Sequence, residues 1–352
     1  MLAVVKEHGG PGFAIKDVSY PVLREDDVII KVRSVGICGT DGPILAGTRE
    51  VPWPLIPGHE FAGDVVETGS RVKNLKVGDR VTPCIVIGCG DCDMCIEGKE
   101  VLCDNLVETG IHVDGAFAEY VRVPEWNLIE LPDLVTMEQA AMLEPMAVAV
   151  HAIRRVQPFA DNQIAICGLG TIGLFVAMFL LEMGCQNIYV AGNKDFQKSM
   201  AVNIGIKEEN FCDIRDKGFS DWILDKTGTK GVDVFFECVG KNEVLKQGIE
   251  SLAPKGKLML VGNPASDMEL EKNLYWKILR RQLQLLGTWN SSFTHEKADD
   301  WNYVLECLQQ QRIKPEKMIT HRMDMESFKD GFEIMRTKRE DYVKILLLPA
   351  SH

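Results

Sequence analysis

The pattern of apolar and polar positions changes character along the chain. From residue 1 to about residue 123, short and often alternating runs such as "DVIIKVRSVGI" and "GAFAEYVRVPE" are separated by turn residues. Alternation with a period of two is typical of strands that bury one face. This part of the chain therefore predicts a small β-barrel or sandwich with loops between its strands.

From about residue 137 the apolar spacing lengthens, and helical segments alternate with short apolar runs. The runs "NQIAIC", "NIYVAG", "VDVFFECVG" and "GKLMLVG" each precede such a segment or a turn. Strands that alternate with helices indicate a parallel sheet covered on both faces. The closing stretch "DYVKILLLP" again has the pattern of a strand. The doubly wound unit is therefore predicted to interrupt a domain that begins and ends the chain.

The length supports two domains, because 352 residues exceed what one hydrophobic core normally serves. We expect residues 1–152 and 290–352 in the first domain and 153–289 in the second. A net charge of -12 argues against nucleic acid or an anionic membrane as partner. The apolar stretch 172–183 is too short to span a membrane, and the N-terminus lacks a signal-peptide pattern. These features predict a cytoplasmic protein.

The segment "CGDCDMCIEGKEVLC" holds Cys89, Cys92, Cys95 and Cys103 at the spacing C-x2-C-x2-C-x7-C. Four thiolates brought together by tight turns make a closed tetrahedral zinc site. Bacterial iron–sulfur segments begin similarly but close with x3 and Cys-Pro. Unliganded thiols in such a cluster would oxidise readily. We therefore expect a structural zinc ion with no part in catalysis.

A second group combines Cys38, Thr40 and Asp41 of "GICGTD" with His59 and Glu60 of "PGHEFAG". A thiolate, an imidazole and a carboxylate can hold a zinc ion and leave one position open, as a Lewis-acid site requires. Thr40 is then a candidate for passing a proton towards solvent, and Asp41 for orienting His59. Taken alone, a buried Cys and a loop His are more often structural.

Glu144, in the apolar stretch "LEPMAVAVHAI", needs a cation or a hydrogen-bond donor nearby. A metal ion is one such partner. An ion pair with Arg154 or Arg155 is the other, and the sequence leaves both open.

The segment "IAICGLGTIG" places a G-x-G-x-x-G pattern after a strand and before a helix. Glycines let the backbone approach a pyrophosphate, and the helix N-terminus offers free N–H groups. A glycine-rich packing turn is the alternative, but the flanking strand and helix favour a dinucleotide site. The predicted contacts on this turn are Gly168, Leu169, Gly170, Thr171, Ile172 and Gly173.

The next strand, in "IYVAGNKDFQK", lacks the acidic residue that usually binds the adenosine ribose. Such an acid repels the 2′-phosphate of NADP, whereas Gly192 removes the repulsion and Asn193 and Lys194 supply donors and a cation. Asp195 lies too far along to bind the ribose if the strand ends at Ala191, but a strand end one or two residues later would make Asp195 a candidate for the ribose. We therefore predict that NADP(H) is preferred over NAD(H).

Together, "GICGTD", "GHEFAG", "VGDRV", the four-cysteine segment, "GAFAEY", "LEP" and "GLGTIG" resemble the zinc-dependent medium-chain alcohol dehydrogenases. The Glu after His59 and the stretch "LEPM" resemble the polyol branch of that family, which includes sorbitol and galactitol-1-phosphate dehydrogenases. The resemblance implies an α/β fold in which a GroES-like β-barrel catalytic domain is interrupted by a Rossmann domain. It also implies a homodimer or a homotetramer.

In that family Cys38, His59 and Glu144 would be ligands of a catalytic zinc ion, directly or through water, with Glu60 exchanging onto the metal. Thr40 and Glu60 would assist proton movement. The implied reaction interconverts a secondary alcohol of a polyol or polyol phosphate with the ketone. Pro43 stands where sorbitol dehydrogenases often have a His or an aromatic residue, and "GTWNSS" resembles the corresponding segment of galactitol-1-phosphate dehydrogenases. Both features of the resemblance imply a phosphorylated substrate. The cationic candidates near such segments, none assigned to a phosphate, are Arg154, Arg155, Lys277, Arg280 and Arg281.

Two alternatives remain. One is a related enzyme acting on a smaller alcohol such as 2,3-butanediol or L-threonine. The other is a non-catalytic scaffold in which the four-cysteine segment is a zinc-ribbon-like binding module. The acidic character of "GDCDMCIEGKE" makes nucleic acid a poor partner for such a module.

Overall fold

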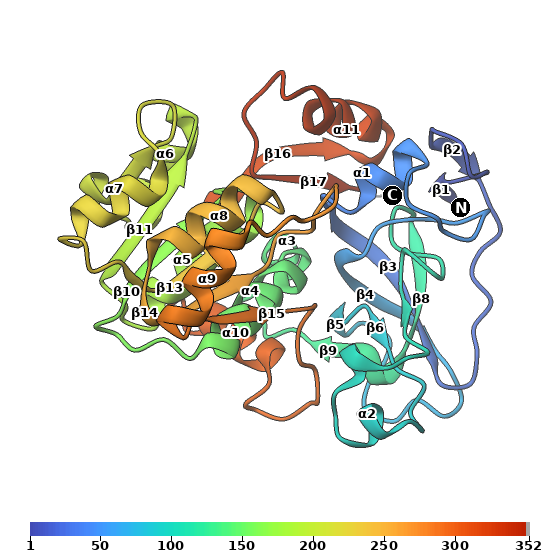
Figure 1. Cartoon of the computed structure of the whole chain (residues 1–352). Helices are drawn as coiled ribbons and strands as arrows, with labels where there is room; N and C mark the ends of the chain where they lie inside the picture. The colour runs from blue at the N-terminus through green and yellow to red at the C-terminus, as the bar shows by residue number, and fades with distance from the viewer. Residues whose placement is uncertain (350–352) are drawn as a thin grey trace. The chain divides into compact units, whose positions relative to one another are not determined.

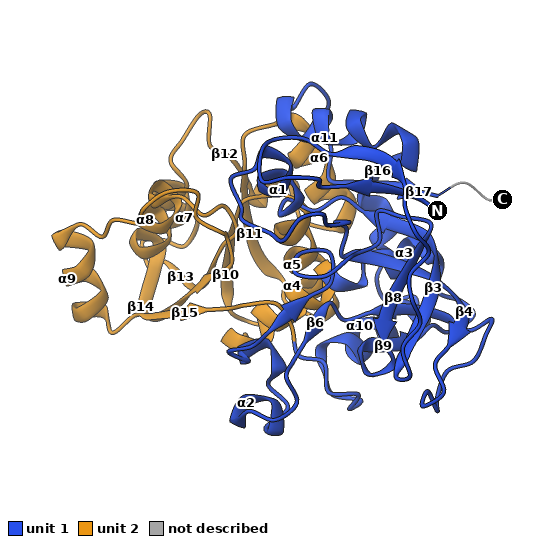
Figure 2. Ribbon diagram, turned by 90° about the vertical axis from the view of Figure 1, so that its right-hand side faces the viewer, with its two compact units in different colours: residues 1–144, 292–352 blue, residues 145–291 orange. Residues whose placement is uncertain are grey.

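The computed structural model describes residues 1–349, which form two compact units (Figure 2). Unit 1 contains Met1–Glu144 and the chain from Ser292 onward, and unit 2 contains Pro145–Ser291. The expected boundaries lay at 152/153 and 289/290. The first of these falls inside helix α4 (Leu143–Val156), because no turn signal in the sequence marks the change of unit.

Unit 1 is built on a seven-stranded sheet in the order β16-β17-β3-β4-β5-β9, with β8 also paired to β3 (Figure 1). The last strand of the chain pairs antiparallel with β3, with Leu346 opposite Gly36. The two ends of the sequence therefore meet in one sheet, as the interrupted-domain prediction requires. These strands are β3 (Asp27–Gly36), β4 (Glu60–Thr68), β5 (Arg80–Pro83), β8 (Tyr120–Pro124), β9 (Leu128–Glu130), β16 (Ile319–Asp324) and β17 (Lys344–Leu348).

Smaller elements surround this sheet. The core beneath them gathers Phe61, Phe117, Phe328 and Phe332 with aliphatic residues of β3, β4 and β17. The two short strand pairs are β1 (Leu2–Val5) with β2 (Ala14–Asp17), and β6 (Val86–Ile87) with β7 (Val107–Glu108). The helices are α1 (Asp41–Ala46), α2 (Asp93–Ile96), α3 (Met137–Ala141), α10 (Asp300–Gln309) and α11 (Phe328–Thr337).

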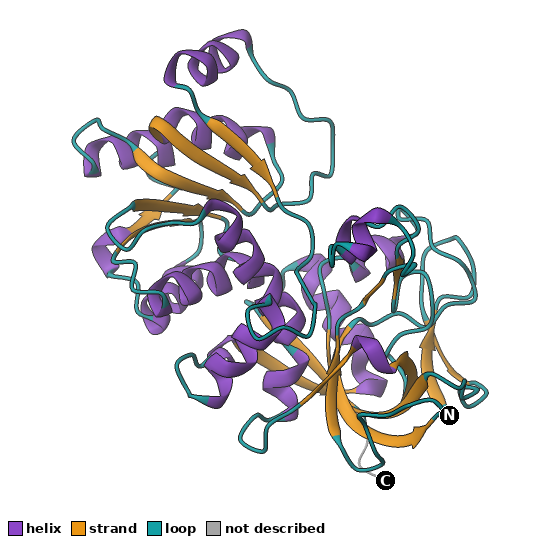
Figure 3. Cartoon of the chain, turned by 90° about the horizontal axis from the view of Figure 1, so that it is seen from below, coloured by secondary structure: helices purple, strands orange, loops and turns teal. Residues whose placement is uncertain are grey.

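Unit 2 is a six-stranded parallel sheet in the order β12-β11-β10-β13-β14-β15, with helices on both of its faces (Figure 3). Its strands are β10 (Gln163–Cys167), β11 (Asn187–Gly192), β12 (Phe211–Asp213), β13 (Val232–Glu237), β14 (Leu252–Leu260) and β15 (Gln284–Gly287). Besides α4, its helices are α5 (Thr171–Glu182), α6 (Asp195–Ile204), α7 (Phe219–Lys226), α8 (Asn242–Ser251) and α9 (Lys272–Arg281).

The order of these strands reverses at β10, which has β11 on one side and β13 on the other. Parallel open sheets bind ligands at such a switch point, outside the carboxyl ends of the strands. The glycine-rich turn follows β10 directly, so unit 2 presents it at this point. Among the described residues, no helix is long and apolar enough to cross a membrane.

Candidate active site

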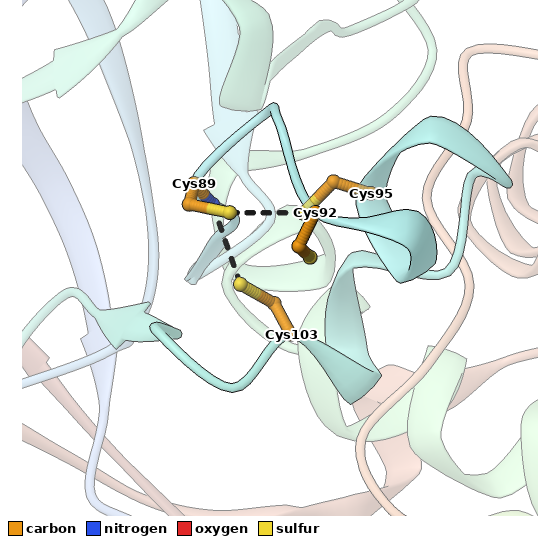
Figure 4. A group of neighbouring side chains, drawn as sticks. All are labelled: Cys89, Cys92, Cys95 and Cys103. Carbon is orange, nitrogen blue, oxygen red and sulfur yellow. Dashed lines mark hydrogen bonds between the residues drawn. The ribbon is translucent and has the colours of Figure 1, made fainter.

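All four predicted cysteines of the first cluster come together in the loop between β6 and β7 (Figure 4). Their sulfur atoms lie within 4.8 Å of one another, and Cys89 and Cys95 sulfurs are 3.9 Å apart. The backbone N–H of Cys89 donates to Cys103 Sγ over 3.4 Å and lowers the pKa of the Cys103 thiol to about 7. Four sulfurs gathered at these distances fit a tetrahedral zinc ion.

Strand register builds the second cluster. β3 and β4 pair antiparallel with Gly36 opposite Glu60, so the chain just after β3 lies beside the start of β4. This brings Cys38, His59 and Glu60 together, with one ligand atom from each within 4.8 Å of the others. His59 and Glu60 are 3% and 2% exposed. Burial raises the pKa of the Cys38 thiol to about 11, so a nearby cation is what would favour its thiolate.

Asp41, the first residue of α1, is fully buried between Cys38 and His59. Its Oδ2 accepts a 2.9 Å hydrogen bond from the Cys38 backbone N–H, and its Oδ1 lies 3.6 Å from His59 Nδ1. Among described residues, neither Oδ1 nor Nδ1 has a hydrogen-bond partner. Burial raises the pKa of the Asp41 carboxyl. The two atoms face each other, and the thiol, imidazole and carboxylates gathered here match the side chains that bind zinc in proteins.

Glu144 lies close enough for the charge of His59 to act on it, but outside the 4.8 Å group. It is 8% exposed, and burial raises the pKa of its carboxyl to about 7. Of the two arginines that were alternative partners for Glu144, Arg155 donates to the Gly287 carbonyl at 3.2 Å.

Lys344 was not predicted as part of this site. It begins β17, is 1% exposed, pairs with Glu60 Oε2, and donates to the Ile37 carbonyl at 3.2 Å. Burial lowers the pKa of its ammonium to about 8. A lysine before the apolar run "ILLL" was the sequence signal for this residue, because a buried ammonium requires a partner.

Two further charged residues were missed. Glu108, the last residue of β7, is 5% exposed, and its Oε2 lies 3.6 Å from Arg49 Nη2. The charge of Glu108 contributes to the raised pKa of Glu144. The charge of Arg49 acts in the opposite sense on Asp41, whose pKa burial raises. The site is thus more highly charged than the sequence indicated.

Thr40, which precedes α1, is half-buried, and its backbone N–H faces the Cys38 sulfur.

In unit 2 the glycine-rich turn has the predicted strand–turn–helix context. Gly168 follows β10 with φ of +102°, and a Cβ on Gly173 would lie 1.8 Å from the Gly168 carbonyl oxygen. Both positions therefore require glycine. Gly170 precedes α5, and no atom lies within 4 Å of the position of a Cβ there. Thr171 and Ile172 open α5, while Leu169 is 2% exposed. The open backbone at Gly170 fits the approach of a pyrophosphate.

Strand β11 extends to Gly192, one residue beyond the expected end, so Asp195 returns as a candidate ligand for the ribose. The space beside Gly192 is occupied rather than open, since a Cβ there would lie 2.8 Å from Gln197 Oε1. Gln197 accepts a 2.9 Å hydrogen bond from the Asn193 N–H and donates to the Leu169 carbonyl at 3.4 Å. Its side chain therefore ties the end of β11 to the glycine-rich turn. Lys194 precedes α6, which Asp195 begins.

The cationic candidates for a phosphate mostly have structural partners. Lys277 donates to the Glu250 carbonyl at 2.7 Å, and Arg281 donates to the Leu252 carbonyl at 2.6 Å. Arg280 lies over the Trp276 ring at 5.1 Å. These contacts join helix α9 to its surroundings or to itself, and they give no sign of a phosphate site.

Comparison with known proteins identifies both parts of the chain. Residues 24–133 match the alcohol dehydrogenase GroES-like domain, and residues 171–310 match the zinc-binding dehydrogenase family. L-threonine 3-dehydrogenase of Yersinia pestis is 29% identical over 347 residues, which cover 97% of this chain and 98% of that protein.

Solved structures of other proteins are similar to this structure over nearly the whole chain. A Sinorhizobium meliloti protein assigned as a zinc-binding dehydrogenase and bound to NADP has a TM-score of 0.91 at 30% identity, covering 99% of each chain. Galactitol-1-phosphate dehydrogenase of Escherichia coli has a TM-score of 0.91 at 26% identity, covering 99% of this chain and 100% of that one. An alcohol dehydrogenase of E. coli CFT073, complexed with NADH, reaches 0.90 at 26% identity over 99% of each chain.

These matches confirm the predicted fold, a GroES-like domain interrupted by a Rossmann domain. They span the cysteine cluster, the residues gathered around Cys38 and the glycine-rich turn. The chain belongs to the zinc-dependent medium-chain alcohol dehydrogenase family and is an NAD(P)-dependent oxidoreductase that acts on an alcohol.

Proposed function

We propose that this enzyme interconverts a secondary alcohol of a polyol or polyol phosphate with the corresponding ketone, using NADP(H). The observation that carries the proposal is the group of half-buried Cys38 and buried His59 and Glu60 beside Asp41. In the proposal Cys38, His59 and Glu144 hold a zinc ion and Glu60 exchanges onto it. That ion supplies Lewis acidity towards the substrate hydroxyl.

The chain's own residues position the reaction. Asp41 Oδ1 faces His59 Nδ1, so we assign Nε2 to the metal and an orienting role to Asp41. Thr40, half-buried beside Cys38, is assigned to passing the substrate proton towards solvent. Lys344 holds Glu60 in place through an ion pair. The turn at residues 168–173 would hold the dinucleotide, which would supply the hydride chemistry when bound.

A second candidate function is oxidation of a smaller alcohol. It is favoured by the similarity to L-threonine 3-dehydrogenase, whereas galactitol-1-phosphate dehydrogenase favours the polyol phosphate. A screen of polyols, polyol phosphates, 2,3-butanediol and L-threonine with both nicotinamide cofactors separates the two. We expect the highest kcat/KM with a polyol or polyol phosphate and NADP. The highest value with L-threonine would establish the second candidate instead.

We also propose that the four-cysteine cluster holds a structural zinc ion. Cys95→Ser is expected to reduce the zinc content from about two ions per chain to about one and to lower the unfolding temperature, because the metal orders a loop with little core of its own. Metal analysis and thermal unfolding measure both effects. Cys185→Ser, at a buried thiol outside the cluster, is the control and should retain about two ions. An unchanged zinc content in Cys95→Ser would contradict the assignment.

The assignment of NADP(H) predicts the effect of an acid at Gly192. Gly192→Asp displaces the Gln197 side chain and places a carboxylate near the expected 2′-phosphate. We expect the ratio of kcat/KM values to shift towards NAD by at least about tenfold. Gly192→Ala is the matched control, because its Cβ meets the same Gln197 oxygen at 2.8 Å without adding charge. Equal shifts in the two variants would mean that crowding, rather than charge, sets the preference.

We further propose that the enzyme forms a homodimer or a homotetramer. Strand β15 is an edge of the unit 2 sheet, and Leu285 on it is 37% exposed. Trp276 and Leu279 of α9 are 46% and 50% exposed. Exposed apolar side chains near an open edge are typical of a subunit contact. Light scattering of the purified protein tests this proposal.

A further inference from the structure

A fixed arginine lies beside the end of β11. Strands β11 and β12 are parallel, with Gly192 opposite Asp213, and the Ile214 N–H donates to the Gly192 carbonyl at 3.0 Å. This register places Arg215 next to residues 192–195, where β11 passes into α6. The segment that contains Arg215 was not singled out in the sequence, because it is far from the glycine-rich turn along the chain.

Two carboxylates hold one edge of the Arg215 guanidinium. Its Nε donates to Asp213 Oδ1 at 2.9 Å, and its Nη2 donates to Asp213 Oδ2 and, at 2.6 Å, to Asp195 Oδ1. Asp195 Oδ1 is therefore engaged. Asp195 Oδ2 accepts nothing from Arg215, so binding of a ribose hydroxyl by Asp195 is the competing role for this residue.

The other edge of the guanidinium is available. Arg215 Nη1 makes no hydrogen bond with any residue in the range 1–349, and the side chain is 50% exposed. A guanidinium whose plane is fixed by carboxylates retains two donors on Nη1 that can reach a phosphate oxygen. Arginine is well suited to phosphate because its donors are planar and its charge is permanent.

We propose that Arg215 is a specificity-determining residue that binds the 2′-phosphate of NADP(H) through Nη1. Asp213 and Asp195 orient the guanidinium, and the negative charge of Asp195 limits the affinity for the phosphate. This inference rests on the proposed NADP(H) function and identifies a residue that sets it. It requires no metal ion, so it can be tested separately from turnover.

The test is calorimetric titration of the full chain with 2′,5′-ADP and with 5′-AMP, which differ only in the 2′-phosphate. Arg215→Gln is expected to weaken 2′,5′-ADP binding roughly 10- to 100-fold, the effect of losing a charge-assisted hydrogen bond, and to leave 5′-AMP binding nearly unchanged. Asp195→Asn is expected to strengthen 2′,5′-ADP binding. The matched control is Lys217→Gln, which removes a nearby cation that pairs with Asp225 instead.

Three outcomes would overturn the inference. One is wild-type protein that binds the two nucleotides equally, which would also remove the NADP(H) preference. Another is a clear wild-type preference that Arg215→Gln leaves intact, which would retain NADP(H) and reject Arg215. The third is weaker 5′-AMP binding in Asp195→Asn with no gain for 2′,5′-ADP, which would make Asp195 a ribose ligand. If Arg215→Gln fails to fold, Arg215→Lys takes its place. This variant keeps the positive charge but lacks the planar guanidinium donors, so it should lose 2′,5′-ADP affinity by less than the roughly 10- to 100-fold expected for Arg215→Gln.

Discussion

Replacing Cys38 with serine is expected to reduce turnover by at least about a hundredfold, because a Lewis-acid metal contributes several kcal/mol of transition-state stabilisation. Cys38 supplies the only sulfur of its cluster, with ligand atoms of His59 and Glu60 within 4.8 Å. A serine hydroxyl is a much poorer zinc ligand than a thiolate. Dinucleotide binding should remain near the wild-type level, because the glycine-rich turn lies in unit 2.

Three measurements on the Cys38→Ser protein separate the possible causes: steady-state turnover, zinc content and titration with the reduced dinucleotide. We expect lost turnover, a loss of about one zinc ion per chain, and retained dinucleotide binding. Cys185→Ser again serves as the control. Full activity in Cys38→Ser would exclude the proposed zinc ligand set, and simultaneous loss of dinucleotide binding would indicate general damage.

Replacing Lys344 with methionine is expected to destabilise unit 1 by about 3–5 kcal/mol, because it leaves a buried charge without its partner. Lys344 and Glu60 are 1% and 2% exposed and form an ion pair. Methionine preserves much of the side-chain volume, so the loss is assigned to the charge. Chemical denaturation measures the change in free energy of unfolding.

A double-mutant cycle gives the control for Lys344. Lys344→Met combined with Glu60→Gln removes both charges, so it should be more stable than Lys344→Met alone. A double variant no more stable than the single one would mean that the lost packing of Lys344, not its charge, causes the effect. The activity of Glu60→Gln alone then reports whether Glu60 contributes to turnover.

Local sequence patterns were sufficient for most of the fold. The alternating strand of residues 27–36 and the apolar closing strand predicted unit 1, and the runs at 163–167 and 187–192 predicted the parallel sheet. Cysteine spacing located the first cluster, because its four residues lie in one short loop. The glycine-rich turn was found for the same reason, since its residues are adjacent along the chain.

Contacts between distant segments could not be predicted this way. Glu60 and Lys344 meet because β17 pairs with β3, and the sequence spacing of these strands does not specify their register. Arg215 meets Asp195 only through the pairing of β12 with β11. The contact of the Gln197 side chain with Gly192 and the glycine-rich turn was likewise not predicted, because a sequence pattern does not give the direction of one side chain.

The most direct test of the central claim follows the absorbance of the reduced nicotinamide with the best polyol or polyol phosphate. Activity is measured on the enzyme as purified, after removal of its metal with a chelator, and after return of zinc. We predict that turnover is lost with the metal and restored by zinc, while dinucleotide binding persists throughout. Undiminished turnover in protein shown by metal analysis to be free of zinc would contradict the account.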